Sequence, residues 1–347
     1  MSIKKEWYGR TTNEKDAWLF TIENTKGMKV QVSNFGAVLT SLWVKNKNGE
    51  LKDVVLGYEK LEGYFDNHPM FGAVVGRNIN RISNGRFEID GVTYELEKNR
   101  GRHNIHSDKE NGFHKVLWDY EPAADNGVKF TYISPEGEQG FPGTLIFSVT
   151  YILTEACGLV ISYRGVSDKK TLINVSNHTY FNLGGHESGN IYNTKIRIFA
   201  DEYTPVDAER IPTGEIASVQ GTPFDFIEAQ RIGNKLNEQS PELQSSGGFD
   251  HNFVIQNQNI GIRKAAEASC EEEGIRMEIY SDLPGLQFYT SNVLEQIKGK
   301  DGAVYGKHSG FCMEPQYYPN SINTEGFYTP LFKKNEEYKT TTIYQFI

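Results

Sequence analysis

The sequence is poor in cysteine, in long apolar stretches and in excess positive charge. Its 347 residues include only three cysteines, which lie far apart at Cys157, Cys270 and Cys312. An odd, widely spaced set of cysteines forms neither a disulfide framework nor a cysteine-rich metal site. No apolar run approaches the roughly 20 residues that span a bilayer, and we see no secretion signal in the first residues. We therefore expect a cytoplasmic protein.

The charge balance is acidic. Lys and Arg number 36 against 45 Asp and Glu, which gives a net charge of −9. A chain of this sign repels phosphate backbones and anionic lipids, so we expect neither a nucleic acid nor a membrane as partner. A neutral small molecule would be indifferent to the charge.

Helical periodicity is scarce, and alternation with a period of two residues is common. Residues 145–153, 128–132 and 276–280 each alternate apolar and polar side chains, which is typical of strands. Asp90-Gly91 and Asn48-Gly49 separate such runs and tolerate the positive φ angles of tight hairpin turns. Residues 227–236 are predicted to form a short helix or a loop.

The chain is rich in aromatic residues, with 19 Tyr and 20 Phe, and these favour strands. No Pro- or Ser-rich linker, repeat or low-complexity run divides it. The patterns predict an all-β protein, a large antiparallel β-sandwich that occupies residues 1–347 as one domain, with function on strand ends and loops.

Polar side chains gather in four places among aromatic residues and glycines. The clusters cover residues 76–82 with 104–106, 174–182, 249–253, and 310–316 with 287–290. A sugar needs such surroundings, because its hydroxyls require paired donors and acceptors while its C–H face requires an apolar platform.

Most of these residues also have an ordinary structural interpretation. Composition alone favours Arg81 as a surface residue, and a core histidine is the more common case for His178. Turn formation is an alternative for Asp250 and Asn252. Glu314 differs, because it follows an apolar run and a buried carboxylate is costly unless it is paired or functional.

The remaining histidines carry less information. His103, His114, His186 and His308 look like solvated loop residues. The spacing His103-x-x-His106 hints at a metal, but no third ligand of a suitable type lies nearby in the sequence. We therefore expect no metal and no other cofactor.

Several blocks carry these residues in a fixed order. They are Asn34-Phe35-Gly36-Ala37, Gly76-Arg77…Asn80-Arg81-Ile82…Gly85, Gly112-Phe113…Lys115-Val116-Leu117-Trp118, Gly140-Phe141-Pro142-Gly143, Asn174…Asn177-His178-Thr179-Tyr180-Phe181-Asn182-Leu183, Phe249-Asp250-His251-Asn252-Phe253, Gln287-Phe288-Tyr289-Thr290, Gly310-Phe311-Cys312-Met313-Glu314-Pro315-Gln316…Pro319 and Thr341-Thr342-Ile343-Tyr344. Together they resemble the aldose 1-epimerase (galactose mutarotase) family over essentially the whole chain. One block departs from the family, which usually has Leu-His-Gly-Gly where this chain has Ile105-His106-Ser107-Asp108. The loop after His106 is therefore expected to differ in backbone conformation.

The resemblance implies a fold, a reaction and a set of site residues. The fold is the large β-sandwich called a supersandwich. The reaction interconverts the α and β anomers of free hexoses such as galactose and glucose by acid–base ring opening and reclosure, without a cofactor. We expect a monomer or a homodimer, without a choice between the two. The implied roles are Glu314 as base, His178 as acid, His106 as a hydrogen-bonding partner near the ring oxygen, and Asn80, Arg81, Asp250 and Gln287 as ligands of the other hydroxyls.

Three other functions are compatible with the same residues. A glycoside hydrolase or lyase would use Asp250 and Glu314 as its carboxylate pair. A non-catalytic sugar-binding protein could keep the fold, since fold alone does not define function. An enzyme of sugar phosphates would need a cluster of cations for the phosphate, and beyond Arg77 and Arg81 the matched blocks show no such cluster.

Overall fold

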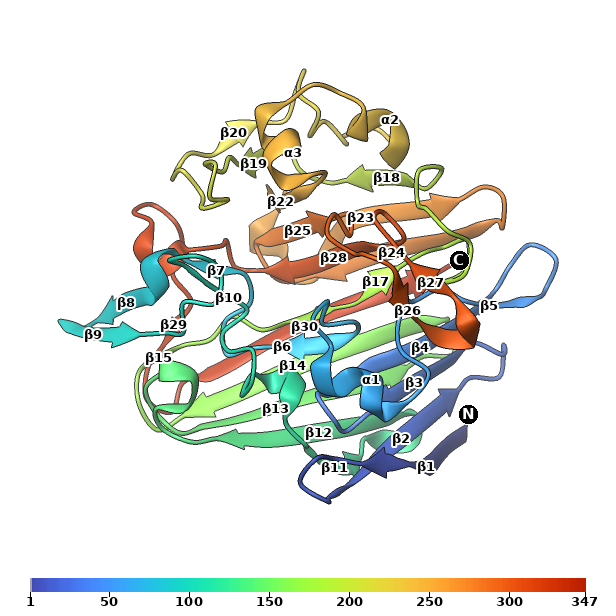
Figure 1. The fold of residues 1–347 in the computed structure, drawn as a ribbon, viewed down its shortest axis with the longest axis horizontal. Coiled ribbons are helices and arrows are strands. Elements are labelled where there is room, and N and C mark those ends of the chain that lie inside the picture. Colours follow the sequence, from blue (N-terminus) through green and yellow to red (C-terminus); the bar gives the residue numbers. More distant parts are fainter. Residues whose placement is uncertain (1) are drawn as a thin grey trace.

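A computed structural model describes residues 2–347, and strands dominate it (Figure 1). Its largest sheet has nine strands, each antiparallel to its neighbours. In spatial order they are β11 (Asp119–Pro122), β12 (Gly127–Ser134), β13 (Leu145–Leu153), β14 (Gly158–Ser167), β30 (Glu337–Phe346), β24 (Ile275–Ser281), β23 (Arg263–Cys270), β18 (Lys195–Ile198) and β21 (Gln230–Arg231).

A second antiparallel sheet packs against the first. Its six strands are β17 (Tyr180–Phe181), β28 (Phe311–Gln316), β25 (Gly285–Tyr289), β22 (Asp250–Val254), β19 (Glu202–Thr204) and β20 (Ala217–Ser218). Tyr344 of β30 donates a hydrogen bond of 2.9 Å to the carbonyl of Met313 in β28, and its ring lies 4.9 Å from that of Phe181. Both sheets contribute to one core cluster of buried residues, so the predicted antiparallel sandwich is confirmed.

The remaining strands form smaller sheets around this sandwich. The N-terminal part is a five-stranded antiparallel sheet, and two-stranded ladders follow. The five strands are β1 (Ser2–Arg10), β2 (Asp16–Glu23), β3 (Lys29–Ser33), β4 (Leu39–Lys45) and β5 (Leu51–Asp53), and the ladders are β6 (Ala73–Val75) with β16 (Ser176–His178), β7 (Arg81–Ile82) with β10 (Asn104–Ile105), β8 (Arg86–Ile89) with β9 (Val92–Glu95), β15 (Thr171–Leu172) with β29 (Leu331–Phe332), and β26 (Ile297–Lys298) with β27 (Val304–Tyr305).

The alternation in the sequence predicts these strands well. β13 has the predicted bounds, and the apolar residues of its predicted core face are buried, while Ile146 on the opposite face is 55% exposed. Both predicted hairpins form. Asp90 and Gly91 adopt positive φ between β8 and β9, as expected. Between β4 and β5, however, only Gly49 of the Asn-Gly pair has positive φ, because the connection is the wider loop 46–50.

Helices are few and short. They are α1 (Leu61–Asp66), α2 (Ile232–Leu236) and α3 (Pro241–Ser246). The segment 227–236, predicted as a short helix or a loop, contains β21 followed by α2. Within residues 2–347, no helix is both long and apolar enough to cross a membrane.

Candidate active site

Three neighbouring strands of the six-stranded sheet present a polar face. Glu314 of β28 lies opposite Gln287 of β25, which lies opposite Asn252 of β22. Asp250 precedes Asn252 by two residues and therefore shares its face. The reverse side of these strands carries the buried core residues Phe253, Phe288 and Met313. A packed sheet thus holds the polar side chains in place, and Asp250 and Asn252 are strand residues rather than turn formers.

Glu314 is a buried carboxylate with few partners. Its side chain is 1% exposed, and its Oε2 atom accepts no hydrogen bond within residues 2–347. Burial, reinforced by the negative charge of Asp250, raises the pKa of Glu314 well above its usual value, although Arg81 opposes the shift. A carboxyl group in this state readily exchanges a proton.

His178 lies beside Glu314 but comes from a distant part of the chain. It ends strand β16, which pairs with β6 and packs against β28. Its Nε2 lies 3.7 Å from Glu314 Oε1, and its Nδ1 lies 3.5 Å from Cys312 Sγ. Its ring stacks on Tyr180 at a centroid distance of 5.0 Å. Burial lowers the pKa of His178 to about 4, so the imidazole is neutral at neutral pH.

His106 is held by the backbone of Asn80. The Asn80 amide donates to His106 Nδ1 at 3.2 Å, and the His106 amide donates to the Asn80 carbonyl at 3.0 Å. Because Nδ1 accepts a hydrogen bond, a neutral His106 ring carries its proton on Nε2. The ring lies edge-on to His178, with centroids 5.3 Å apart. Burial, with His178 and Arg81 adding to it, lowers the pKa of His106 well below its usual value.

The loop after His106 has the conformation that glycine prefers although it lacks glycine. His106 and Ser107 adopt φ angles of 57° and 64°. Such left-handed conformations are strained for residues with a Cβ atom. Ser107 is fully buried, and its hydroxyl accepts from the Asn78 amide at 2.8 Å and donates to the Asn78 carbonyl at 3.0 Å. These bonds offset the strain and fix the loop next to Asn80.

A second group of polar residues is linked by hydrogen bonds. Arg81 Nη2 lies 2.9 Å from Asp250 Oδ2, and Gln287 Nε2 donates to Asp250 Oδ1 at 2.7 Å. Arg81 is also bonded to the Asn80 side chain, at 3.3 Å. Burial raises the pKa of Asp250, but the charges of Arg81 and His251 and the hydrogen bonds outweigh it and lower the pKa from 3.8 to about 2. Arg81 is only 4% exposed, so its interpretation as a surface residue is wrong.

The two groups share one cavity of about 290 Å³. All seven residues that the sequence predicts line it: Asn80, Arg81, His106, His178, Asp250, Gln287 and Glu314. Tyr180, Tyr289, Met70 and Leu294 add apolar surface. The volume and the mixture of paired polar groups with aromatic surface suit a small polar ring compound.

The four histidines predicted as solvated are all buried. His103 accepts a hydrogen bond from the Asn84 amide, His186 lies 3.0 Å from the Tyr305 hydroxyl, and His308 lies 2.7 Å from the Thr290 carbonyl. His114 lines the cavity, and burial lowers its pKa to about 3. The prediction failed because loops from distant parts of the chain cover these residues.

Arg77 is a structural residue and does not line the cavity. Its buried guanidinium donates to the Ser134 hydroxyl and to backbone carbonyls of residues 134, 135, 142 and 143. Other cations line the cavity instead, and the sequence analysis assigned none of them to the site: Arg100, Lys109, Lys115 and Arg210.

Within residues 2–347, only one group of potential metal ligands is close enough together to hold an ion. It consists of His178, Cys312 and Glu314, whose ligand atoms lie within 4.8 Å of one another. His103 and His106 do not belong to it, so the spacing that hinted at a metal has no structural counterpart.

Comparison with known proteins settles the family. Residues 19–345 match the sequence profile described as aldose 1-epimerase. The chain belongs to the aldose 1-epimerase family. It is 44% identical to a galactose mutarotase of Bos taurus over 320 residues, which cover 92% of this chain and 91% of that protein. It is 36% identical to an aldose 1-epimerase of Escherichia coli strain K12, with 95% of both chains covered.

Solved structures of aldose 1-epimerases agree with this assignment. The crystal structure of a galactose 1-epimerase from Lactobacillus acidophilus NCFM superimposes with a TM-score of 0.88 and 30% identity, covering 100% of this chain and 98% of that one. The chain is thus an isomerase whose reaction is the mutarotation of aldose sugars.

Proposed function

We propose that this aldose 1-epimerase interconverts the anomers of free hexoses such as galactose and glucose, with Glu314 as the base and His178 as the acid. The observation that carries the assignment is a buried carboxylate with a free oxygen, 3.7 Å from a buried imidazole, on the wall of a cavity of sugar size. Proton transfer needs two groups within reach of one small molecule, and this pair meets that condition.

The reaction follows from the positions of these groups. Glu314 removes the proton of the C1 hydroxyl while His178 protonates the ring oxygen. The bond between C1 and the ring oxygen breaks, and C1 becomes an aldehyde carbon. Rotation about C1–C2 turns the other face of the aldehyde to the ring oxygen, and the two proton transfers run in reverse to close the ring. Protons and charges balance over the cycle, so no oxidant or reductant is needed.

Glu314 and His178 share one proton, which lies on one residue in the free enzyme and on the other in the reactive form. The pKa of Glu314 is raised and that of His178 is lowered to about 4, so the free enzyme keeps the proton on Glu314. Moving it to His178 gives the reactive form without any change in the number of bound protons. A C1 hydroxyl that donates to Glu314 and a ring oxygen that accepts from His178 both favour this form.

The hydrogen-bonded group around Asp250 binds the sugar. Asp250 stays ionised and accepts from hydroxyls, Arg81 and Gln287 donate to them, and Asn80 holds Arg81 in place. His106 presents its Nε2 proton close to His178 and stabilises the developing charge near the ring oxygen.

Polarimetry tests the proposal. Freshly dissolved α-glucose and α-galactose should reach their equilibrium rotation faster with the enzyme than without it, at a rate proportional to enzyme concentration. The spontaneous rate alone would mean a sugar-binding protein without catalysis. Release of monosaccharide from a disaccharide would instead indicate a glycoside hydrolase that uses Asp250 and Glu314.

A second candidate substrate is an aldose with an anionic substituent. Arg210 lines the cavity, lies 3.8 Å from Asp250 and makes no side-chain hydrogen bond within residues 2–347. Arg81 also pairs with Asp250, so this carboxylate faces two guanidinium groups and can balance the charge of only one of them. A lower KM for glucose 6-phosphate or glucuronate than for glucose would favour this class, whereas equal or higher values would exclude it.

The cellular setting stays a prediction. Cys157, Cys270 and Cys312 are unpaired, which suits the reducing conditions of the cytoplasm. We propose a single domain, because one core cluster includes residues from the first strands to the last. A monomer or a homodimer remains expected.

A further inference from the structure

The group formed by His178, Cys312 and Glu314 combines the three ligand types that divalent zinc prefers. It offers an imidazole nitrogen, a thiol sulfur and a carboxylate oxygen, all buried and all within 4.8 Å of one another. We propose that Zn²⁺ binds these three side chains and thereby inhibits the enzyme. The inhibition rests on the proposed roles of Glu314 and His178, but the binding does not.

One pair of ligand atoms already has the spacing of a tetrahedral zinc site, and the third ligand is close to it. Zinc lies about 2.3 Å from sulfur and about 2.0–2.2 Å from nitrogen or oxygen, which puts neighbouring ligand atoms about 3.3–3.6 Å apart. Cys312 Sγ lies 3.5 Å from His178 Nδ1. Glu314 Oε1 lies 3.7 Å from the other ring nitrogen, Nε2, so the carboxylate must move towards Nδ1 and Sγ for all three side chains to bind one ion.

The charges of the complex balance. The Cys312 thiol and the Glu314 carboxyl both release their protons to solvent when the ion binds, and His178 binds as a neutral ring. Zn²⁺ with one thiolate and one carboxylate has no net charge, so the buried site gains no uncompensated charge. Without the ion, burial and the nearby Glu314 raise the pKa of Cys312 well above its usual value, which keeps the thiol protonated.

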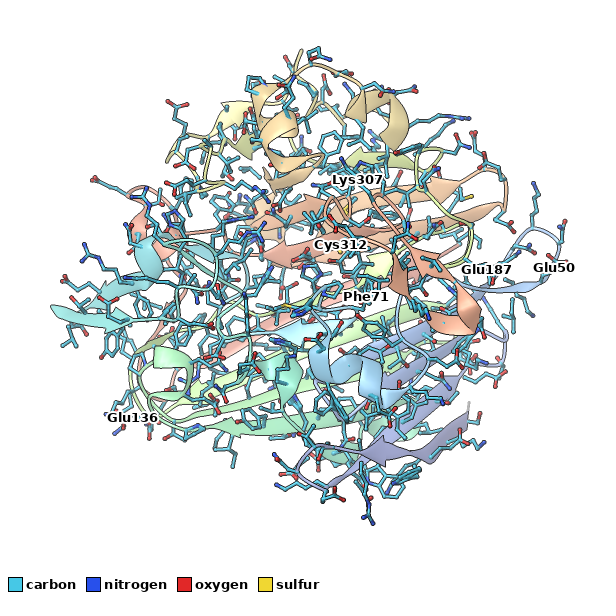
Figure 2. All side chains as sticks on the ribbon, in the orientation of Figure 1. Glu50, Phe71, Glu136, Glu187, Lys307 and Cys312 are labelled. Carbon is cyan, nitrogen blue, oxygen red and sulfur yellow. The ribbon has the colours of Figure 1, made fainter. Side chains whose placement is uncertain are left out.

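The fold explains why the sequence gives no sign of this group. Cys312 and Glu314 are two residues apart on β28 and point to the same face, while His178 comes from β16. Cys312 lies near the middle of the molecule in Figure 2 and is fully buried. It does not line the cavity, whereas His178 and Glu314 do. An ion therefore enters through the sugar cavity and occupies both proton-transfer groups.

Cobalt provides a spectroscopic test that does not depend on activity. Co²⁺ is added to metal-free enzyme, where a thiolate ligand produces a charge-transfer absorption band. We expect the band in the wild type and its loss when excess galactose or Zn²⁺ is added. In parallel, polarimetry should show Zn²⁺ inhibition that is competitive with galactose and reversed by EDTA, while EDTA alone leaves the zinc-free rate unchanged.

Cysteine variants identify the sulfur. The double variant Cys157→Ser/Cys270→Ser leaves Cys312 as the sole thiol and should keep the band and the zinc sensitivity. Cys312→Ser should lose the band and require about tenfold more Zn²⁺, or still more, for half-inhibition relative to its own zinc-free rate.

The outcomes separate the two proposals. Absence of the band from the wild type or from the double variant overturns the metal site, and so does equal zinc sensitivity of Cys312→Ser and the wild type. The result with the double variant holds even if Cys312→Ser fails to fold. A cobalt band in a protein without mutarotase activity would overturn the proposed function alone.

Discussion

Two groups of polar residues line the cavity, a binding end formed by Asp250, Arg81 and Gln287 and a proton-transfer end formed by Glu314 and His178, and their carboxylates are in opposite states. Asp250 is paired with Arg81 and Gln287, and its pKa is lowered to about 2. Among the described residues 2–347, Glu314 has one carboxylate oxygen without a hydrogen-bond partner, and its pKa is raised. Both are largely buried, so the difference comes from the neighbours that each one has.

This contrast assigns the roles within the site. A carboxylate that is locked as an anion by a guanidinium is a poor proton carrier but a good acceptor for sugar hydroxyls. A carboxyl group with a raised pKa beside an imidazole is suited to moving protons. The variants below test whether catalysis belongs to one end and binding to the other.

The largest effect is expected for Glu314→Gln. Glutamine keeps the shape of the side chain but cannot accept the C1 proton, so turnover should fall by about 10⁴-fold, at the upper end of what one acid–base group contributes. Polarimetry measures the rate, and calorimetric titration with galactose should show that binding persists. Turnover near that of the wild type would remove Glu314 from the base role and with it the contrast between the two ends.

His178→Asn should lower turnover by roughly 10²–10⁴-fold if His178 is the acid. Stability should change little, because asparagine keeps one hydrogen-bonding group. A histidine with only a structural role would give the reverse pattern, a loss of about 1–3 kcal/mol of stability with normal turnover of the folded fraction. The thermal midpoint and the polarimetric rate of the same preparation distinguish the two.

Asp250→Asn tests the binding end. Loss of a charged hydrogen-bond acceptor should raise KM by about 10- to 100-fold with a smaller change in kcat. Leaving Arg81 without its partner should also cost about 3–5 kcal/mol of stability. Because the pKa of Asp250 is lowered, the wild type should lose this stabilisation only as the pH falls from about 4 towards 2. A fall in kcat with unchanged KM would place Asp250 among the proton-transfer groups.

The pH profile of kcat/KM should show the shared proton of the other end. A second proton binds to the pair at about pH 4, the lowered pKa of His178, so activity should fall below that pH and not below 6.5. On the alkaline side, activity should persist until the proton leaves Glu314 at its raised pKa. A fall in kcat/KM below about pH 6.5 would instead indicate a histidine whose pKa has its ordinary value.

Much of this architecture is predictable from the sequence, for physical reasons. Alternation in residues 145–153 predicts β13, because one face of that strand contacts the core and the other contacts solvent. The seven site residues follow from the family resemblance, and the structure brings all of them to one cavity. Whether each one acts as proposed remains to be tested.

What the sequence does not predict depends on contacts between distant segments. The sequence suggests a solvated loop position for His114, but its side chain is buried. Arg77 and Arg81 stand in the same block of the sequence, but the Arg77 guanidinium donates to backbone carbonyls. The approach of Cys312 to His178 joins residues 134 positions apart. No local pattern encodes such contacts, because they form only when distant segments meet, as where β17 pairs with β28 next to His178.

The strained loop at His106 and Ser107 has a consequence for the thermodynamics of sugar binding. A glycine-rich loop samples many shapes in the free enzyme, and a ligand that selects one of them loses affinity to that ordering. Here the Ser107 hydroxyl fixes the shape through Asn78 when the chain folds. The entropy of ordering the loop is thus lost when the chain folds, and a sugar that binds next to this loop loses no affinity to that ordering.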